Sequence, residues 1–231
     1  MADRNRVRRS YDELGDTYVS RRSEDGTGLA VLEEFLSRCP DDAFVLDAGC
    51  GPGDPVLSRL TDAGAACGVD FSREQLRLAA DAAPDASLVQ GDMTALPVAA
   101  DSVDAVVAYW SLIHVPIDDH RTVLEEFRRV LTADGRLLVC EGTNPWTGEN
   151  PDWLASGVCM EWEIAGAEAT RRRLEAVGFT VLDSWGVPEE LREDTGGEGG
   201  ADEPDGRDEH SSGETDGDDG QPWTFFETSV D

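Results

Sequence analysis

The stretch VLDAGCGPG, residues 45–53, decides how the rest of the chain is interpreted. A short apolar run, residues 44–46, ends in Asp47 and then in a cluster of glycines, which is typical of a buried strand that enters a tight loop. We expect a helix to follow, because Asp54 can cap its first turn and Pro55 suits its first position. These residues therefore predict a strand, a glycine loop and a helix in succession.

The same alternation continues along the chain. Apolar runs and helical stripes follow one another, which predicts a mainly parallel sheet covered by helices on both faces, an α/β fold of the doubly wound type. The expected strands are residues 66–70, 87–90, 103–109, 136–141, 181–185 and 223–230, and the further expected helices are residues 6–22, 28–38, 73–82, 118–131 and 167–177.

The spacing of the glycines separates two kinds of cofactor. A dinucleotide-binding loop has the pattern G-x-G-x-x-G and places a pyrophosphate at the start of the helix. Here the pattern is G-x-G-x-G between Asp47 and Asp54, and two carboxylates would repel a pyrophosphate. One carboxylate could instead pair with the ammonium group of a methionine moiety. A plain tight turn with a solvated Asp47, and a nucleotide- or NAD-dependent oxidoreductase, remain as alternatives.

Two further carboxylates follow the next two strands. Asp70 ends the second strand, about 20 residues after the glycine loop, where an acidic residue hydrogen-bonds ribose hydroxyls in related sheets. Asp92 ends the third strand. Each of them alone could be a turn former, but the strand ends of such a sheet meet at one crevice. Three carboxylates there match a cationic cofactor that carries a ribose.

These motifs together resemble those of class I methyltransferases that use S-adenosylmethionine (SAM), and most closely the small-molecule group that includes the ubiquinone and menaquinone methyltransferases. The resemblance covers residues 6–187 and the final strand. It implies a Rossmann-like, seven-stranded sheet with an antiparallel last strand, SAM as the cofactor and methyl transfer to a small-molecule acceptor. The matching stretches are VLDAGCGPG (45–53), VDFS (69–72), GDM (91–93) with Leu96-Pro97, VDAVVAYWSLIHV (103–115) and EFRRVLTADGRLLV (126–139).

The resemblance also implies roles for residues at the matching positions. Asp70 is expected to hold the ribose, and Phe71 to flank the adenine. Asp92 and the backbone of Met93 are expected to bind the adenine edge. The expected contacts of the methionine end and its surroundings are Asp47, Gly49, Cys50, Gly51, Gly53 and Ala108. Relatives have two glycines where this chain has Asp134-Gly135, which we interpret as a surface turn.

The N-terminal helices, within residues 1–38, are expected to form a lid over the site. Tyr11 and Tyr18 match aromatic lid residues of relatives, Tyr18 being a candidate cofactor contact, although both also fit a packing stripe. His114 follows the fourth strand and is the candidate general base or acceptor contact; the alternative is a hydrogen-bonded structural histidine. Candidate walls of a dry acceptor pocket are Tyr109, Trp110, Trp146, Trp153 and Trp162. Residues 108–111 lack the Asn/Asp-Pro-Pro pattern of DNA amino-methyltransferases.

The charge of the chain limits its partners. The formal net charge of the 231 residues is -30, and the 19 basic residues are all arginine. We interpret this as adaptation of a cytoplasmic protein to concentrated salt, with recognition of a basic partner as the alternative. Nucleic acid is not expected as a partner, because a basic footprint is missing. Five cysteines and three histidines show no metal-ligand spacing, and no apolar run or leader predicts a membrane span or a secretory signal.

Residues 189–220 differ in composition from the rest of the chain. This tract holds 14 acidic residues and eight glycines, and it precedes a final strand-like segment. It is therefore expected to be a disordered insertion within a single domain that spans residues 1–231. The sequence leaves open the acceptor, the atom that is methylated and the oligomeric state. It also leaves open whether the domain binds SAM without transferring a methyl group.

Overall fold

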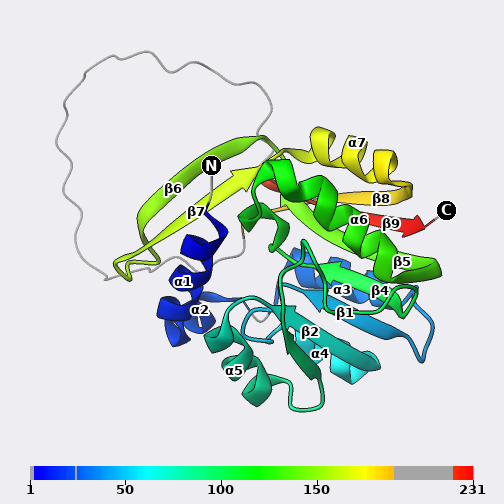
Figure 1. Ribbon diagram of the computed structural model, residues 1–231, viewed down its shortest axis with the longest axis horizontal. Coiled ribbons are helices and arrows are strands. Elements are labelled where there is room, and N and C mark those ends of the chain that lie inside the picture. Colours follow the sequence, from blue (N-terminus) through cyan, green and yellow to red (C-terminus); the bar gives the residue numbers. More distant parts are fainter. Residues whose placement is uncertain (1–2, 24, 190–220, 231) are drawn as a thin grey trace, which may run out of the picture.

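The protein is described from a computed structural model, which covers residues 3–23, 25–189 and 221–230. Its centre is a seven-stranded sheet, whose strands run in colour from the blue of β1 to the red of β9 in Figure 1. The first five strands in sheet order pair in parallel, whereas β9 runs antiparallel to both of its neighbours. This confirms the predicted fold class. The sheet order is β3 (Ser87–Gln90), β2 (Ala65–Asp70), β1 (Phe44–Ala48), β4 (Val103–Ala108), β5 (Leu131–Gly142), β9 (Trp223–Val230) and β8 (Phe179–Val187).

Helices cover both faces of this sheet. Successive strand residues point to opposite faces, so Val45 packs in one apolar core and Leu46 in the other. The helices on the first face are α3 (Thr27–Leu36), α4 (Val56–Ala63) and α5 (Arg73–Ala82), and those on the second are α6 (His120–Val130) and α7 (Ala167–Val177). The order of the strands reverses between β1 and β4, which places a crevice at their carboxyl ends.

The N-terminal segment forms two helices where the sequence predicts one over residues 6–22. These are α1 (Arg4–Leu14) and α2 (Asp16–Arg21), and the break between them is at Gly15. The predicted stripe is present, because Val7, Tyr11 and Leu14 are all buried. It packs against Trp153 and Met160, outside the main sheet.

That neighbour of α1 is a separate hairpin, which the sequence analysis does not predict. Its strands are β6 (Trp146–Trp153) and β7 (Val158–Ile164), and they extend beyond the sheet beside α1 in Figure 1. The two chain segments that lead into and out of the hairpin meet at its base, where the Ala167 N–H donates to the Thr143 carbonyl over 3.1 Å.

Two local predictions are wrong. Helix α4 has Pro55 as its N-cap residue and no side-chain cap; Asp54 instead accepts a hydrogen bond from the hydroxyl of Ser58 at 2.7 Å. The cis peptide bond between Asp54 and Pro55 belongs to this entry into the helix. Asp134-Gly135 is not a turn between elements but part of β5, which begins earlier than predicted and pairs irregularly with β4 at its start.

The predictions about the acidic tract, a membrane span and a metal site can be compared only with the described residues. The acidic tract falls almost wholly on residues 190–220, outside the described residues. Among the residues that the structure covers, no helix is long and apolar enough to cross a bilayer. Within the same residues there is no group of three or more side chains that could hold a metal ion.

Candidate functional site

The glycine loop is fixed to the end of β2 by its own backbone. The N–H groups of Gly49 and Cys50 both donate to the Val69 carbonyl, at 2.7 and 3.1 Å. Gly49 has a φ of +81°, and a Cβ atom there would lie 2.4 Å from the Cβ of Ser111. A side chain is therefore excluded at this position, both by the backbone conformation and by the close approach of the segment after β4.

Asp47 lies beneath this loop with an unsatisfied oxygen. Its side chain is 1 % exposed, and Oδ2 has no hydrogen-bond partner among the described residues. Burial raises the pKa of this carboxyl from 3.8 to about 7, although the positive charge of Arg22 opposes the shift. An unpartnered buried carboxyl of this kind suits a site that receives a cation.

Asp70 closes the same site from β2. Its carboxylate accepts hydrogen bonds from the N–H groups of Gly51 and Ser72, at 2.9 and 2.8 Å. Burial raises the pKa of Asp70 to about 6, and these backbone hydrogen bonds act against the shift. The group is thus held in one orientation at the strand end, where it can accept further hydrogen bonds from a ligand.

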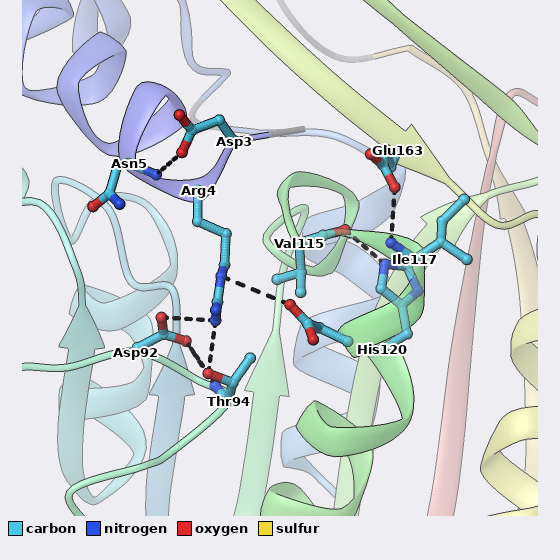
Figure 2. A network of polar contacts seen from close by, with 10 residues as sticks. Asp3, Arg4, Asn5, Asp92, Thr94, Val115, Ile117, His120 and Glu163 are labelled. Atoms are coloured by element: carbon cyan, nitrogen blue, oxygen red, sulfur yellow. Dashed lines mark hydrogen bonds and ion pairs between the residues drawn. The ribbon is translucent and has the colours of Figure 1, made fainter. Parts of the chain in front are cut away.

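Asp92 is engaged by an arginine that the sequence analysis does not single out. Figure 2 shows Arg4 of α1 reaching Asp92 and Thr94. The guanidinium Nη1 lies 3.0 Å from Asp92 and 2.8 Å from Thr94, and Nε lies 3.7 Å from Asp119. The ion pair between Arg4 and Asp92 therefore holds helix α1 against the end of β3, although the two residues are far apart in the sequence.

These groups line one cavity at the carboxyl end of the sheet. Eight predicted site residues contribute to its wall: Tyr18, Gly49, Gly51, Asp70, Phe71, Asp92, Met93 and His114. Further wall residues that the sequence analysis did not assign to the cofactor include Arg4, Tyr11, Arg22, Gly91, Tyr109, Trp110 and Ser111. The cavity thus combines the backbone of the glycine loop with carboxylates, guanidinium groups and aromatic rings.

Four predicted contacts do not line this cavity. Asp47 lies behind the loop, as described above, and Cys50 packs in the core beneath α4. Gly53 approaches α5 closely, since a Cβ there would lie 3.0 Å from the Cα of Ala79. Ala108 is fully buried in the opposite core. Cys50 and Ala108 therefore pack in the two apolar cores, and Gly53 packs against α5.

Arg22 places a positive charge beside the buried carboxyls. Its Nη1 donates to the hydroxyl of Tyr18 over 3.0 Å, and its guanidinium carbon lies 5.5 Å from the centroid of the same ring. It is held at the wall of the cavity, near Gly51. No motif marks Arg22 in the sequence, because it follows α2 and reaches the site only through the tertiary fold.

His114 lies at the end of a short 3-10 helix, Leu112–His114, directly after β4. Its Nδ1 lies 3.2 Å from the carbonyl of Glu161, and its Nε2 lies 2.8 Å from the hydroxyl of Tyr11. A carbonyl can only accept, so Nδ1 carries the proton and Nε2 accepts from Tyr11. Burial lowers the pKa of His114 to about 4, which keeps the ring neutral at neutral pH.

The segment that carries His114 is anchored on both sides, as Figure 2 shows for the residues that follow it. The Ile117 N–H donates to the carboxylate of Glu163 over 2.9 Å, and His120 Nε2 donates to the Val115 carbonyl over 2.9 Å. Glu163 belongs to β7. The hairpin therefore positions the loop of His114 through main-chain contacts as well as through side chains.

A second cavity, of about 570 Å³, adjoins the first. Both are lined by Tyr11, Tyr18, Trp110 and His114, so these four residues form a shared wall. Of the aromatic residues predicted to line an acceptor pocket, Trp110, Trp146, Trp153 and Trp162 line this cavity, whereas Tyr109 lines only the first. Trp223, which the sequence analysis did not assign to the pocket, completes the aromatic lining.

Comparison with known proteins identifies the family of this fold and site. A model described as a methyltransferase domain matches residues 45–135. A SAM-dependent methyltransferase from Methanosarcina mazei has the same fold, with a TM-score of 0.63 at 18 % identity over 87 % of this chain and 96 % of that chain. Residues 45–135 thus match a methyltransferase domain, and the fold is that of SAM-dependent methyltransferases.

Curated proteins that are similar to part of the chain are also methyltransferases. A demethylmenaquinone methyltransferase of Mycolicibacterium vanbaalenii is 39 % identical over 140 residues, which is 60 % of this chain and 58 % of the relative. Methyltransferase GfsG of Streptomyces halstedii is 39 % identical over 124 residues, 49 % of this chain and 44 % of the relative. The matched part of the chain thus spans less than two thirds of either methyltransferase.

The side chains around the first cavity, whose volume is about 60 Å³, match the chemistry of SAM, the cofactor that similarity to SAM-dependent methyltransferases implies. Asp70 lines this cavity in an orientation that two backbone hydrogen bonds fix, whereas Asp47 lies behind the loop with one unsatisfied carboxyl oxygen. Gly49 also lines the cavity, and Ser111 and Met93 lie close to the position that a Cβ atom would take there. Asp92 and Phe71 lie further along the same wall, where an adenine would be held.

Proposed function

We propose that the chain transfers a methyl group from SAM to a small-molecule acceptor by in-line displacement. One observation carries this proposal: the polar cavity and the aromatic cavity meet at a shared wall, made of Tyr11, Tyr18, Trp110 and His114. A donor held in one cavity would face an acceptor held in the other. Alignment of this kind can supply about 7–11 kcal/mol of the barrier reduction.

The residues of the first cavity would hold the cofactor. Asp47 would pair with the ammonium of the methionine end, Asp70 would accept hydrogen bonds from the ribose, and Asp92 would contact the adenine edge. When bound, SAM supplies a methyl group on a positively charged sulfur. Helices α1 and α2 bring Arg4, Tyr18 and Arg22 to the wall, which supports a role for them as a lid over this cavity.

Tyr11 and His114 would act on the acceptor. The hydroxyl of Tyr11 donates to the neutral Nε2 of His114, so its oxygen keeps lone pairs that can accept a hydrogen bond from the acceptor. The pair can therefore orient a nucleophile at the shared wall. Aromatic faces around this point would stabilise the positive charge that moves from sulfur to acceptor.

The nature of the acceptor is supported by relatives and by charge. Curated relatives include demethylmenaquinone methyltransferases, which argues for a small organic molecule. The net charge of -30 argues against a nucleic acid as the acceptor. The origin in concentrated salt and the cytoplasmic location expected from the same charge stay predictions.

An alternative is supported by one structural neighbour. The [4+2]-cyclase SpnF is 27 % identical and matches 70 % of this chain and 60 % of that chain, with a TM-score of 0.57. By its name, that protein performs a cyclisation. The alternative for this chain is therefore a domain that binds SAM and transfers no methyl group.

Two measurements separate these possibilities. Calorimetric titration with SAM and with NADH tests the cofactor, and we expect SAM alone to bind. A library of small molecules is then screened for the SAM-dependent release of S-adenosylhomocysteine. Binding of NADH in preference to SAM would reject the proposed cofactor, and SAM binding without any turnover across the library would favour the non-transferring domain.

A further inference from the structure

The aromatic cavity has two separate aromatic walls. The first comes from α1, α2 and the hairpin, where Trp153 contacts Tyr11, Tyr18 and Trp162 at centroid distances of 6.0, 5.6 and 5.4 Å. The second comes from the strand ends, where Trp110 and Trp223 contact each other at 6.0 Å. The cavity volume of about 570 Å³ lies within the range of small-molecule sites.

The charges on this cavity have one sign. Among the described residues that line it, the charged ones are Glu149 and Glu189, and none is basic. Arg6 lies behind the wall and pairs with Glu149 at 3.4 Å and with Glu161, so it offsets part of this charge without lining the cavity. His114 is neutral because burial lowers its pKa. An acceptor with a carboxylate or a phosphate would therefore find no counter-ion here.

Aromatic faces together with carboxylates favour a different ligand. Tryptophan faces bind organic ammonium ions through the negative face of the ring, and carboxylates at the rim attract such ions. Resting on the proposed methyl transfer, we propose that the acceptor is an amine with an apolar body and that its nitrogen receives the methyl group.

The chemistry of the site agrees with an amine. The neutral amine, formed by loss of its proton to water in the open cavity, forms the new N–C bond while the S–C bond breaks and its electron pair stays on sulfur. The nitrogen then carries the positive charge, and no proton has to leave in that step. A hydroxyl acceptor would need a base, and His114 is a weak one whose Nε2 already accepts from Tyr11. An N–H of the amine can donate to the oxygen of Tyr11, which orients it.

Three probes with one indole body test this inference: tryptamine, tryptophol and indole-3-acetate. Each is titrated by calorimetry into the full-length protein saturated with S-adenosylhomocysteine. Each is also incubated with SAM, and methylated products are identified by mass spectrometry. We expect tryptamine to bind about tenfold tighter than indole-3-acetate and a few-fold tighter than tryptophol, the size of one or two cation–π contacts. We expect N-methyltryptamine as the product.

Two variants and one control test whether the side chains of the second cavity bind the amine. Trp162→Leu and Glu149→Gln should each weaken tryptamine binding about three- to tenfold, with Glu149→Gln leaving tryptophol binding unchanged. Glu168→Gln on α7 removes an exposed carboxylate that pairs with Arg172 and does not line the cavity, and it should change neither. Equal or tighter binding of tryptophol or indole-3-acetate, or binding of none of the three, would overturn the inference.

The outcomes also separate this inference from the proposed function. If the oxygen of tryptophol is methylated in preference to the nitrogen of tryptamine, methyl transfer stands and the amine inference fails. If tryptamine binds selectively but no acceptor, including those of the library, releases S-adenosylhomocysteine, methyl transfer fails and with it the assignment of the nitrogen as methyl acceptor.

Discussion

Two regions line the same opening and are built in different ways. At the carboxyl ends of β1, β2 and β4, backbone groups and buried carboxylates are fixed by the centre of a seven-stranded sheet. In the β6–β7 hairpin, side chains form the surface, and the two strands pack on α1 outside the sheet. The proposed cofactor side therefore depends on main-chain geometry, whereas the proposed acceptor side depends on the choice of aromatic residues. Four predictions test this contrast, from the largest expected effect to the smallest.

Gly49→Ala should be the most damaging change. The added Cβ would meet Ser111 at 2.4 Å in a backbone conformation with a φ of +81°. We expect a loss of about 3 kcal/mol or more in the free energy of unfolding and no measurable SAM binding, by thermal denaturation and calorimetry. Gly157→Ala in the hairpin turn is the matched control, because its φ is +76° but its Cβ would meet no atom within 4 Å. An equal loss of stability in both variants would show that the positive φ alone, and not the contact with Ser111, causes the destabilisation.

His114→Ala should reduce turnover by about 100-fold while SAM affinity stays within about threefold. The reason is that His114 lies at the shared wall and holds the hydroxyl of Tyr11. Steady-state kinetics with an acceptor from the library measure the first effect and calorimetry the second. Tyr11→Phe, which removes only the hydroxyl, should lower turnover in the same direction. Full activity of the His114 variant would make this histidine a structural residue.

Asp70→Ala should weaken SAM binding by about 1.5–3 kcal/mol, because it removes charge-assisted hydrogen bonds to the ribose. Calorimetry at matched salt measures the loss. The comparison variant is Glu149→Gln on the hairpin side, which should leave SAM affinity within about threefold, since Glu149 lines only the second cavity. If both variants lose SAM affinity to the same degree, the proposal that SAM binds in the first cavity and the acceptor in the second is wrong.

Asp47→Asn is expected to have an effect on stability whose size depends on pH. The folded-state pKa of about 7 lies above the ordinary 3.8, so the folded state binds the proton more tightly than the unfolded chain. Stability therefore falls as pH rises between about 4 and 7, and the asparagine variant avoids this cost. We expect it to be more stable than the parent at pH 8 and equal in stability at pH 4 in denaturant titrations.

The same variant should bind SAM more weakly at pH 8, because the ionised carboxylate is the proposed partner of the ammonium group. For the parent protein, SAM affinity should rise as the pH rises from about 4 to 7, because Asp47 must lose its proton when SAM binds. Calorimetry in buffers of different ionisation enthalpy measures the number of protons released. A variant that is neither more stable nor weaker in SAM binding at pH 8 would contradict the assignment of Asp47.

The cofactor side could be predicted from the sequence because its signals are local. The glycine spacing, and the carboxylates Asp70 and Asp92 at strand ends, follow directly from strands that are recognisable by their apolar runs. Arg4 and Arg22 could not be found in this way. Their contacts with Asp92 and Tyr18 depend on how α1 and α2 pack, and no spacing in the sequence encodes that packing.

The hairpin escaped prediction for a different reason. Strand β6 contains Gly148 and Pro151, residues that interrupt strand patterns, and most of its side chains are exposed, so no apolar alternation marks it. Its tryptophans were recognised as candidate pocket residues, but their arrangement as one wall with Tyr11 and Tyr18 needed the fold. The register of β6 with β7 also shifts between Asn150 and Trp153.

The closed base of the hairpin has a consequence for how such enzymes diversify. Because the Ala167 N–H donates to the Thr143 carbonyl, the chain leaves the end of β5 and returns to α7 through two points that are already joined. A hairpin of another length or composition could be inserted between these points without altering the strands that carry the glycine loop. Exchange of residues 144–166 with those of a homologue would then replace the part of the second cavity that the hairpin lines, while the glycine loop stays with the host sheet.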